Sequence, residues 1–120
     1  MDPIVLLALA LFTKHFIVDF PLQVEYQWRN KGTYGHPGGI VHAVLHGIGT
    51  YLCFCWITIE IAIIFAIADM IIHYHIDWAK MKLNSRFAWK PESSKEFWWL
   101  LGLDQYLHAL TYILMIGLLV

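Results

Sequence analysis

Residues 40–79, IVHAVLHGIGTYLCFCWITIEIAIIFAIADMIIHYHIDWA, decide the fold class of this chain. The run is about twice as long as the ~20 apolar residues that cross a bilayer as one helix. A more polar stretch around Thr58 interrupts it near its middle. We therefore predict a tight helical hairpin made of two membrane spans, near residues 39–57 and 59–79.

Two further apolar runs flank this hairpin. Residues 4–20 and 97–120 each approach or exceed the length of a span, and polar segments at residues 21–38 and 80–96 connect the runs. The first run lacks the basic start and the small-residue cleavage site of a signal peptide, so we expect it to be retained. We predict an all-α fold, an integral membrane four-helix bundle that forms a single domain over residues 1–120.

The composition agrees with a membrane protein. Of the 120 residues, 59% are hydrophobic and 14% are charged, whereas a soluble domain has about half and about a quarter. The formal net charge of -1 provides no basic stripe of the kind that nucleic acid requires. We therefore expect the lipid bilayer as a partner and nucleic acid to be excluded, and the sequence leaves homo-oligomerisation open.

The basic residues outside the apolar runs indicate a topology. They lie in the two longer connections, whereas the N-terminus, the turn near residue 58 and the C-terminus carry no Lys or Arg. Cytoplasmic loops are enriched in these residues. We therefore predict a bacterial inner-membrane protein with both termini outside the cytoplasm.

Ionisable residues inside the predicted spans occur in pairs separated by four residues. This spacing places both side chains on one helix face, and ionisable groups in a span usually point into the bundle. The pairs are His15 and Asp19, His42 and His46, His73 and Asp77, and Asp104 and His108. Because the pairs end the first and third spans and begin the second and fourth, all four lie at the cytoplasmic side.

These eight residues are the predicted metal ligands. Imidazole and carboxylate together suit Zn²⁺ first, and also Mn, Fe or Co. The site has room for one or two divalent ions. Whether His42 or His46 is the ligand from the second span stays open.

Neighbouring polar residues complete the predicted site. Gln23 and Gln105 are expected to orient a ligand, a water molecule or the substrate. Lys80 lies at the interface, where it could contact an anionic headgroup or a phosphate. Asp69 lies one turn deeper than the ligands, where it could bind a second ion, receive a proton or pair with His46.

Three sequence elements carry a family resemblance. They are HFIVDFPLQ at residues 15–23, HYHIDWAK at residues 73–80 and DQYLH at residues 104–108. They resemble the DUF3307 family of small bacterial and phage membrane proteins of unknown function, over nearly the whole chain. That family is distantly similar to membrane-bound metal-dependent hydrolases, so the resemblance implies a hydrolase-like metal protein.

The leading functional hypothesis is metal-dependent hydrolysis of a lipid-linked or membrane-proximal ester, amide or phosphoester. Asp69 or Asp77 would act as a general base, and Lys80 or Gln105 would stabilise an oxyanion or phosphate.

The alternative is a metal or proton transporter, or a structural protein stapled by metal. A pathway should continue across the membrane, but the second span is almost wholly apolar beyond His46, which favours a closed-ended site. Haem is disfavoured, because carboxylates accompany the histidines.

Overall fold

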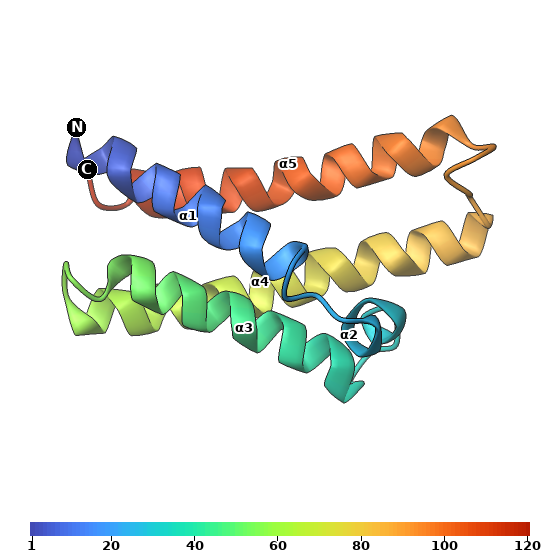
Figure 1. Ribbon diagram of the computed structural model, residues 1–120, viewed down its shortest axis with the longest axis horizontal. Coiled ribbons are helices and arrows are strands. Elements are labelled where there is room, and N and C mark those ends of the chain that lie inside the picture. Colours follow the sequence, from blue (N-terminus) through green and yellow to red (C-terminus); the bar gives the residue numbers. More distant parts are fainter.

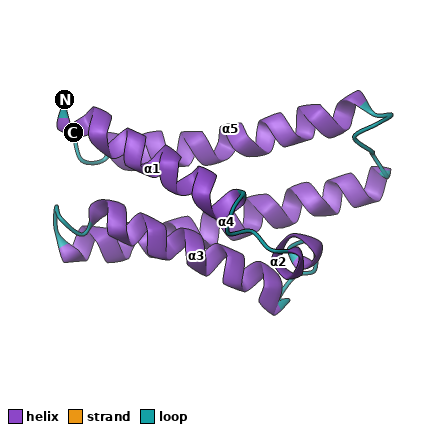
Figure 2. Cartoon of the chain, viewed as in Figure 1, coloured by secondary structure: helices purple, strands orange, loops and turns teal.

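The computed structural model describes residues 1–120 and contains helices joined by turns, without strands (Figure 2). The helices are α1 (Pro3–Asp19), α2 (Glu25–Asn30), α3 (Pro37–Phe54), α4 (Ile59–Phe87) and α5 (Lys95–Gly117). The all-α prediction is confirmed. There are five helices rather than four, because part of the first polar connection forms the short helix α2.

The four long helices run along the long axis of the molecule (Figure 1). Both termini and the α3–α4 turn lie at one end, whereas α2 and the α4–α5 connection lie toward the other. Helices α3 and α4 pack as an antiparallel hairpin, α1 contacts α3 and α5, and α2 packs on α3. The predicted hairpin therefore forms the base on which the other helices lie.

Local capping residues explain where the long helices begin. Before α1, the Asp2 side chain accepts a hydrogen bond from the Ile4 backbone N–H at 2.7 Å. Before α4, the Thr58 hydroxyl oxygen accepts one from the Ile61 N–H at 3.1 Å. Such side chains satisfy N–H groups that lack a partner in the first turn. Thr58 thus lets α4 start only a few residues after α3 ends.

Helix α4 is longer than predicted. The sequence predicts a connection over residues 80–96, but α4 continues to Phe87 and only residues 88–94 lie between α4 and α5. Lysine and arginine favour helix nearly as well as many apolar residues do, and residues 59–90 contain no Gly or Pro that would interrupt the helix. The helix ends where Ala88 adopts a left-handed conformation, with φ of 51°.

The bundle has two kinds of interior. At the end that holds the termini, an apolar cluster fills the space between the helices; it consists of Leu7, Leu11, Cys53, Phe54, Ala62, Phe65, Tyr112, Met115 and Ile116. Farther along the axis the interior is polar, and 13 of the 28 buried residues of the chain are polar or charged. Soluble proteins rarely bury so large a share of charged groups.

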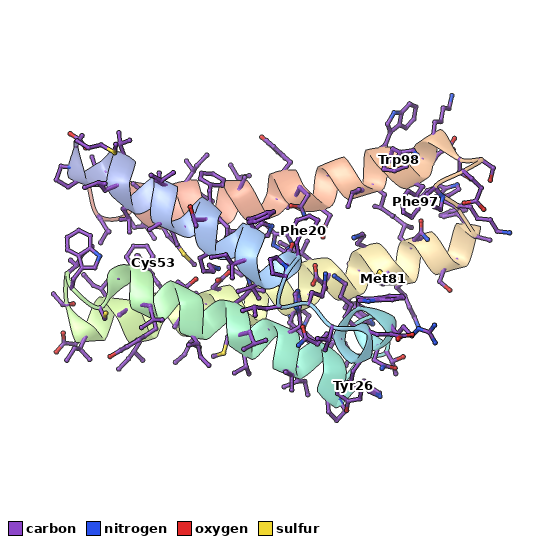
Figure 3. The ribbon with its side chains drawn as sticks, viewed as in Figure 1. Phe20, Tyr26, Cys53, Met81, Phe97 and Trp98 are labelled. Carbon is purple, nitrogen blue, oxygen red and sulfur yellow. The ribbon has the colours of Figure 1, made fainter.

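The outer surface is correspondingly apolar. Side chains project outward along all the long helices (Figure 3), and large apolar ones are widely exposed, for example Leu52 at 64%, Ile64 at 61% and Leu114 at 61%. Polar groups therefore gather inside this bundle while apolar groups cover much of its outside.

One helix, α4, is long and apolar enough to cross a membrane, whereas the sequence predicts four such spans. Helix α1 has 17 residues, which is short for a span. Buried ionisable residues such as Asp69 and His73 lie within the one candidate span as well.

Candidate metal centre

The structure brings all eight predicted ligands together in one buried polar cluster near the middle of the bundle. Each of the four long helices contributes two of them, and none is more than 8% exposed. The polar cluster consists of His15, Asp19, His42, His46, His73, Asp77, Asp104 and His108. The four-residue spacing therefore identified the helix faces that meet.

Four residues of the polar cluster direct donor atoms at one point. Asp19 Oδ1 lies 3.1 Å from His42 Nε2, 2.8 Å from His46 Nε2 and 3.8 Å from His73 Nε2. The Nε2 atoms of His42 and His73 lie 3.3 Å apart. Ligands at about 2.1 Å from a tetrahedral zinc ion are ~3.4 Å from one another. The spacing of these donors therefore fits one ion.

A second group of three residues overlaps the first. Asp77 Oδ2 lies 3.2 Å from His73 Nε2, and Asp77 Oδ1 lies 3.3 Å from His108 Nε2. The donor atoms of these three residues also converge closely enough to hold an ion. His73 belongs to both groups, and one imidazole nitrogen has one electron pair for one ion. The two groups therefore compete for the Nε2 atom of His73.

Lysines compensate three of the four buried carboxylates. The ion pairs are Lys14–Asp69 at 2.7 Å, Lys31–Asp77 at 3.2 Å and Lys80–Asp104 at 3.6 Å. The fourth carboxylate, Asp19, has no lysine and faces imidazoles and an amide instead. A buried charge without an opposite charge is costly. With neutral imidazoles, four carboxylates and three ammonium groups leave one negative charge, and a cation beside Asp19 would compensate it.

The two histidines of α3 both present Nε2 to Asp19, but they differ in which ring nitrogen carries the hydrogen. His42 Nδ1 lies 3.2 Å from Gln27 Oε1, and since this oxygen accepts, Nδ1 carries the hydrogen and Nε2 keeps a free electron pair. His46 Nδ1 lies 3.3 Å from Lys14 Nζ, and since an ammonium group donates, Nδ1 accepts and Nε2–H donates to Asp19. The hydrogen bonds thus favour His42 as the ligand from α3, the choice that the sequence leaves open.

His15 supports the Asp19 carboxylate and lies outside both groups of converging donors. Its Nε2 is 3.0 Å from Asp19 Oδ2 and 3.0 Å from Gln105 Oε1, and its Nδ1 is 2.9 Å from the Tyr112 hydroxyl. The Gln105 amide N–H donates to Asp19 Oδ2 at 3.4 Å and to Asp104 Oδ2 at 3.1 Å. Gln105 therefore has the orienting contacts that the sequence predicts for it.

Gln23 contacts the backbone of the site rather than a ligand atom. Its amide N–H donates to the Asp19 carbonyl oxygen at 2.6 Å, and its Oε1 accepts from Lys31 Nζ at 3.0 Å. It thereby links the end of α1 to the lysine that pairs with Asp77.

Asp69 lies next to the polar cluster but in neither group of converging donors. Its Oδ2 accepts hydrogen bonds from Lys14 Nζ at 2.7 Å and from the Thr50 hydroxyl at 2.5 Å. The considered pairing with His46 is wrong, because the Lys14 ammonium group contacts both residues and takes that place.

Three residues of the site, Lys14, Lys31 and Gln27, are not predicted from the sequence. By its position in the sequence Lys31 is one of the loop charges that indicate topology, yet it is 7% exposed and reaches Asp77. Lys14 lies within an apolar run, and that unusual position is a signal for a buried partner. In the structure Gly49 makes room for this side chain, because a Cβ there would overlap Lys14. Nothing in the sequence indicated that α2 folds back to place Lys31 and Gln27.

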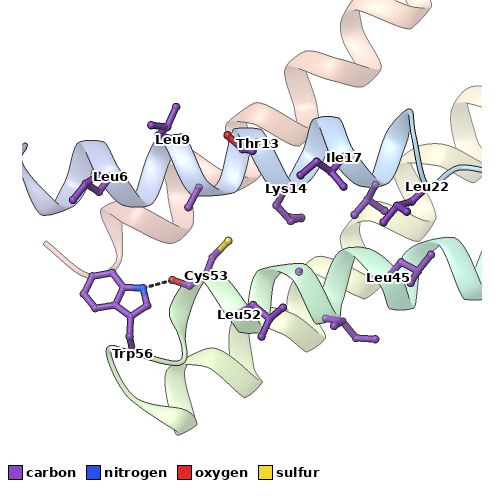
Figure 4. Close-up of a pocket in the computed structure, with 14 residues that line it drawn as sticks. Leu6, Leu9, Thr13, Lys14, Ile17, Leu22, Leu45, Leu52, Cys53 and Trp56 are labelled. Carbon is purple, nitrogen blue, oxygen red and sulfur yellow. Dashed lines mark hydrogen bonds between the residues drawn. The ribbon is translucent and has the colours of Figure 1, made fainter.

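A groove of about 680 Å³ lies between α1 and α3 on the outside of the polar cluster (Figure 4). Lys14 is the only charged residue that lines it, and its ammonium group contacts Asp69 inside the bundle. Trp56 lies near one end, where its indole N–H donates to the Cys53 carbonyl oxygen. The groove is therefore an apolar surface and not an opening of the metal centre.

Comparison with known proteins identifies a family. The profile of a family described as protein of unknown function (DUF3307) matches residues 6–120. No curated protein and no solved structure matches the chain. The match covers every residue of the polar cluster.

Proposed function

Since this chain belongs to the DUF3307 family of proteins of unknown function, we propose its function from its own residues: a membrane-embedded, metal-dependent hydrolase. The observation that carries the proposal is the convergence of donor atoms on the one buried carboxylate, Asp19, that lacks a lysine. The proposed substrate is a lipid-linked or membrane-proximal ester, amide or phosphoester.

The distribution of polar and apolar side chains supports a membrane location. We propose that all four long helices cross the bilayer, because apolar residues cover their outside while charged residues lie in the interior. Basic residues that are not buried lie at the end opposite the termini, among them Arg29, Lys82, Arg86, Lys90 and Lys95. This arrangement favours a bacterial inner-membrane protein with both termini outside the cytoplasm.

The ligand set that we propose is Asp19, His42 and His73 around one zinc ion. A single divalent ion suits the charge inventory better than two, because the other carboxylates already have lysines. Three protein ligands with an open fourth position are typical of catalytic zinc sites. When bound, zinc would supply Lewis-acid activation of water.

The surrounding residues have distinct proposed roles. The Nε2–H group of His46 holds Asp19 Oδ1 at 2.8 Å. Asp77 Oδ2 lies 3.3 Å from His42 Nε2 and 3.2 Å from His73 Nε2, so it is better placed to act as a general base than Asp69, which contacts Lys14 and Thr50 rather than a proposed ligand. Lys80 of α4 and Gln105 of α5 both contact Asp104, and there they can bind an oxyanion or a phosphate.

The second candidate function is a structural metal site without catalysis. Full burial favours it, since His73 is 0% and His42 1% exposed. Transport is supported less, because the apolar cluster, which includes Leu11, Phe54 and Tyr112, closes the end of the bundle toward the termini.

Elemental analysis of detergent-purified protein tests the metal site. We expect about one zinc per chain, and we expect Asp19→Asn and His73→Ala to lose it because each removes a converging donor. His75→Ala is the matched control, since His75 lies on the same helix but is exposed and hydrogen-bonds to Tyr34. Zinc-free wild-type protein, or full zinc content in both variants, would contradict the proposal.

Hydrolysis assays separate the two candidates. Zinc-loaded protein should release product from ester- and phosphoester-linked lipid analogues, and Asp77→Asn should reduce the rate while zinc is retained. A protein that holds zinc, unfolds on chelation and hydrolyses none of these analogues would instead support the structural role.

A further inference from the structure

We propose that the groove between α4 and α5 binds the headgroup of a phospholipid that carries a hydroxyl group, and presents it to the metal centre. This inference names the substrate class of the proposed hydrolase and rests on that function. The groove has a volume of about 350 Å³ and runs along the outer side of the two helices near the polar cluster.

Most of the residues that line the groove are aliphatic. They come from both helices and are Ile76, Ala79, Leu83, Leu100, Leu103 and Leu107, and His75 lines the groove beside them. In a bundle that lies in a bilayer, such a groove faces lipid rather than water, and its walls suit the upper part of an acyl chain. A water-soluble substrate would gain nothing from these contacts.

Two charged side chains, Lys80 and Asp104, also line the groove. The Lys80 ammonium group is 3.6 Å from Asp104 Oδ2, a long ion pair, and its side chain is 17% exposed. It therefore has hydrogen-bond donors to offer to a phosphate oxygen. Because a phosphate needs such a cation and the aliphatic walls need a hydrocarbon chain, the two features together indicate a phospholipid.

Asp104 adds the preference for a hydroxyl group. The residue is 3% exposed, and its Oδ1 atom lies 3.3 Å from His108 Nε2, inside the bundle. Its Oδ2 atom is 3.6 Å from the Lys80 ammonium group and accepts a hydrogen bond from Gln105 at 3.1 Å. A carboxylate oxygen can accept a further hydrogen bond, and a hydroxyl group of the lipid headgroup, next to the phosphate held by Lys80, would donate it.

The same carboxylate connects the groove to the metal centre. His108 Nε2 is 3.3 Å from Asp104 Oδ1 and 3.3 Å from Asp77 Oδ1, so Asp104 contacts a member of the second group of converging donors directly. Exposed basic residues nearby, Lys82 and Arg86, line a neighbouring hollow on α4. They would attract anionic lipid to this side of the membrane.

Native mass spectrometry of the zinc-loaded protein tests this inference. The protein is released from micelles that contain equal amounts of phosphatidylglycerol, which has a phosphate and hydroxyl groups, and phosphatidylcholine, which has no hydroxyl group in its headgroup. We expect phosphatidylglycerol to be retained preferentially. Lys80→Gln should lower its retention about tenfold, because a charge-assisted hydrogen bond is lost.

Two further variants make the result specific. Lys82→Gln removes a charge from the same helix outside this groove, and it should change retention far less than Lys80→Gln. Ala79→Phe fills the groove at an exposed position without changing charge, and it should also lower retention. Equal effects of Lys80→Gln and Lys82→Gln would show general attraction to an anionic surface and overturn the inference, as would unchanged retention in Ala79→Phe.

The metal content of the same samples distinguishes the two proposals. Zinc with no preference between the lipids would overturn the lipid inference and leave the metal centre standing. Absence of zinc from the wild-type protein would overturn the proposed function itself, whatever lipid is retained.

Discussion

The apolar and the polar region of the bundle interior are stabilised by different interactions. Near the termini, the apolar cluster packs by shape, as when the rings of Phe54 and Phe65 meet edge to face with centroids 4.8 Å apart. In the middle, charge pairs and hydrogen bonds join the same four helices. Tyr112 belongs to both regions, because its ring is buried in the apolar cluster while its hydroxyl contacts Lys14 and His15.

This difference separates stability from function. Apolar packing tolerates substitutions of similar volume, whereas a buried charge depends on one particular partner. The apolar end therefore needs only suitable side-chain sizes, while the polar cluster fixes the identity and protonated atom of each residue. Such costly specificity is expected where a site binds a ligand.

The largest effect is expected for Lys14→Met. Methionine preserves much of the side-chain length but leaves the Asp69 carboxylate buried without its ion-pair partner, which should destabilise the protein by about 3–5 kcal/mol. Unfolding in mixed micelles with increasing denaturing detergent measures the change. The double variant Lys14→Met/Asp69→Asn should recover most of the stability, and a double variant as unstable as the single one would show that the ion pair is not the cause.

A substitution in the apolar cluster should lower the stability of the protein without changing its zinc content. Phe54 is 0% exposed, so Phe54→Ala leaves a cavity and should lower the free energy of unfolding by about 3 kcal/mol. The zinc content of the folded protein should not change, because the substitution removes no ligand and no charge. Loss of zinc from folded Phe54→Ala would show that the two regions are coupled, with Tyr112 as the connecting residue.

The sequence predicted the convergence of the site better than its details. The four-residue spacing of pairs such as His73 and Asp77 depends on helix geometry alone, so it located the buried faces without any tertiary information. The partners of Lys31 and Gln27 depend on how α2 folds back onto α3, and no local pattern encodes that approach. The extension of α4 to Phe87 differs from the prediction for another reason: the polar residues after Ala79 mark the end of an apolar run and not the end of the helix.

The smallest effect tests how the polar cluster selects its ligand atom. Gln27→Leu removes the acceptor at His42 Nδ1 and should weaken zinc binding about 10–100-fold, as is usual for partners of metal ligands. Competition with a zinc chelator measures the affinity, and the ¹⁵N chemical shifts of the His42 ring report which nitrogen carries the hydrogen. Gln27→Glu keeps an acceptor at this place and should retain the affinity, and Arg29→Gln, on the exposed side of α2, is the matched control.

If Gln27→Leu bound zinc as tightly as Arg29→Gln, with an unchanged His42 spectrum, the hydrogen bond from α2 would not determine whether His42 or His46 binds zinc. Equal losses in Gln27→Leu and Gln27→Glu would mean that Gln27 acts by its shape, as residues of the apolar cluster do, and not by the hydrogen bond that it accepts.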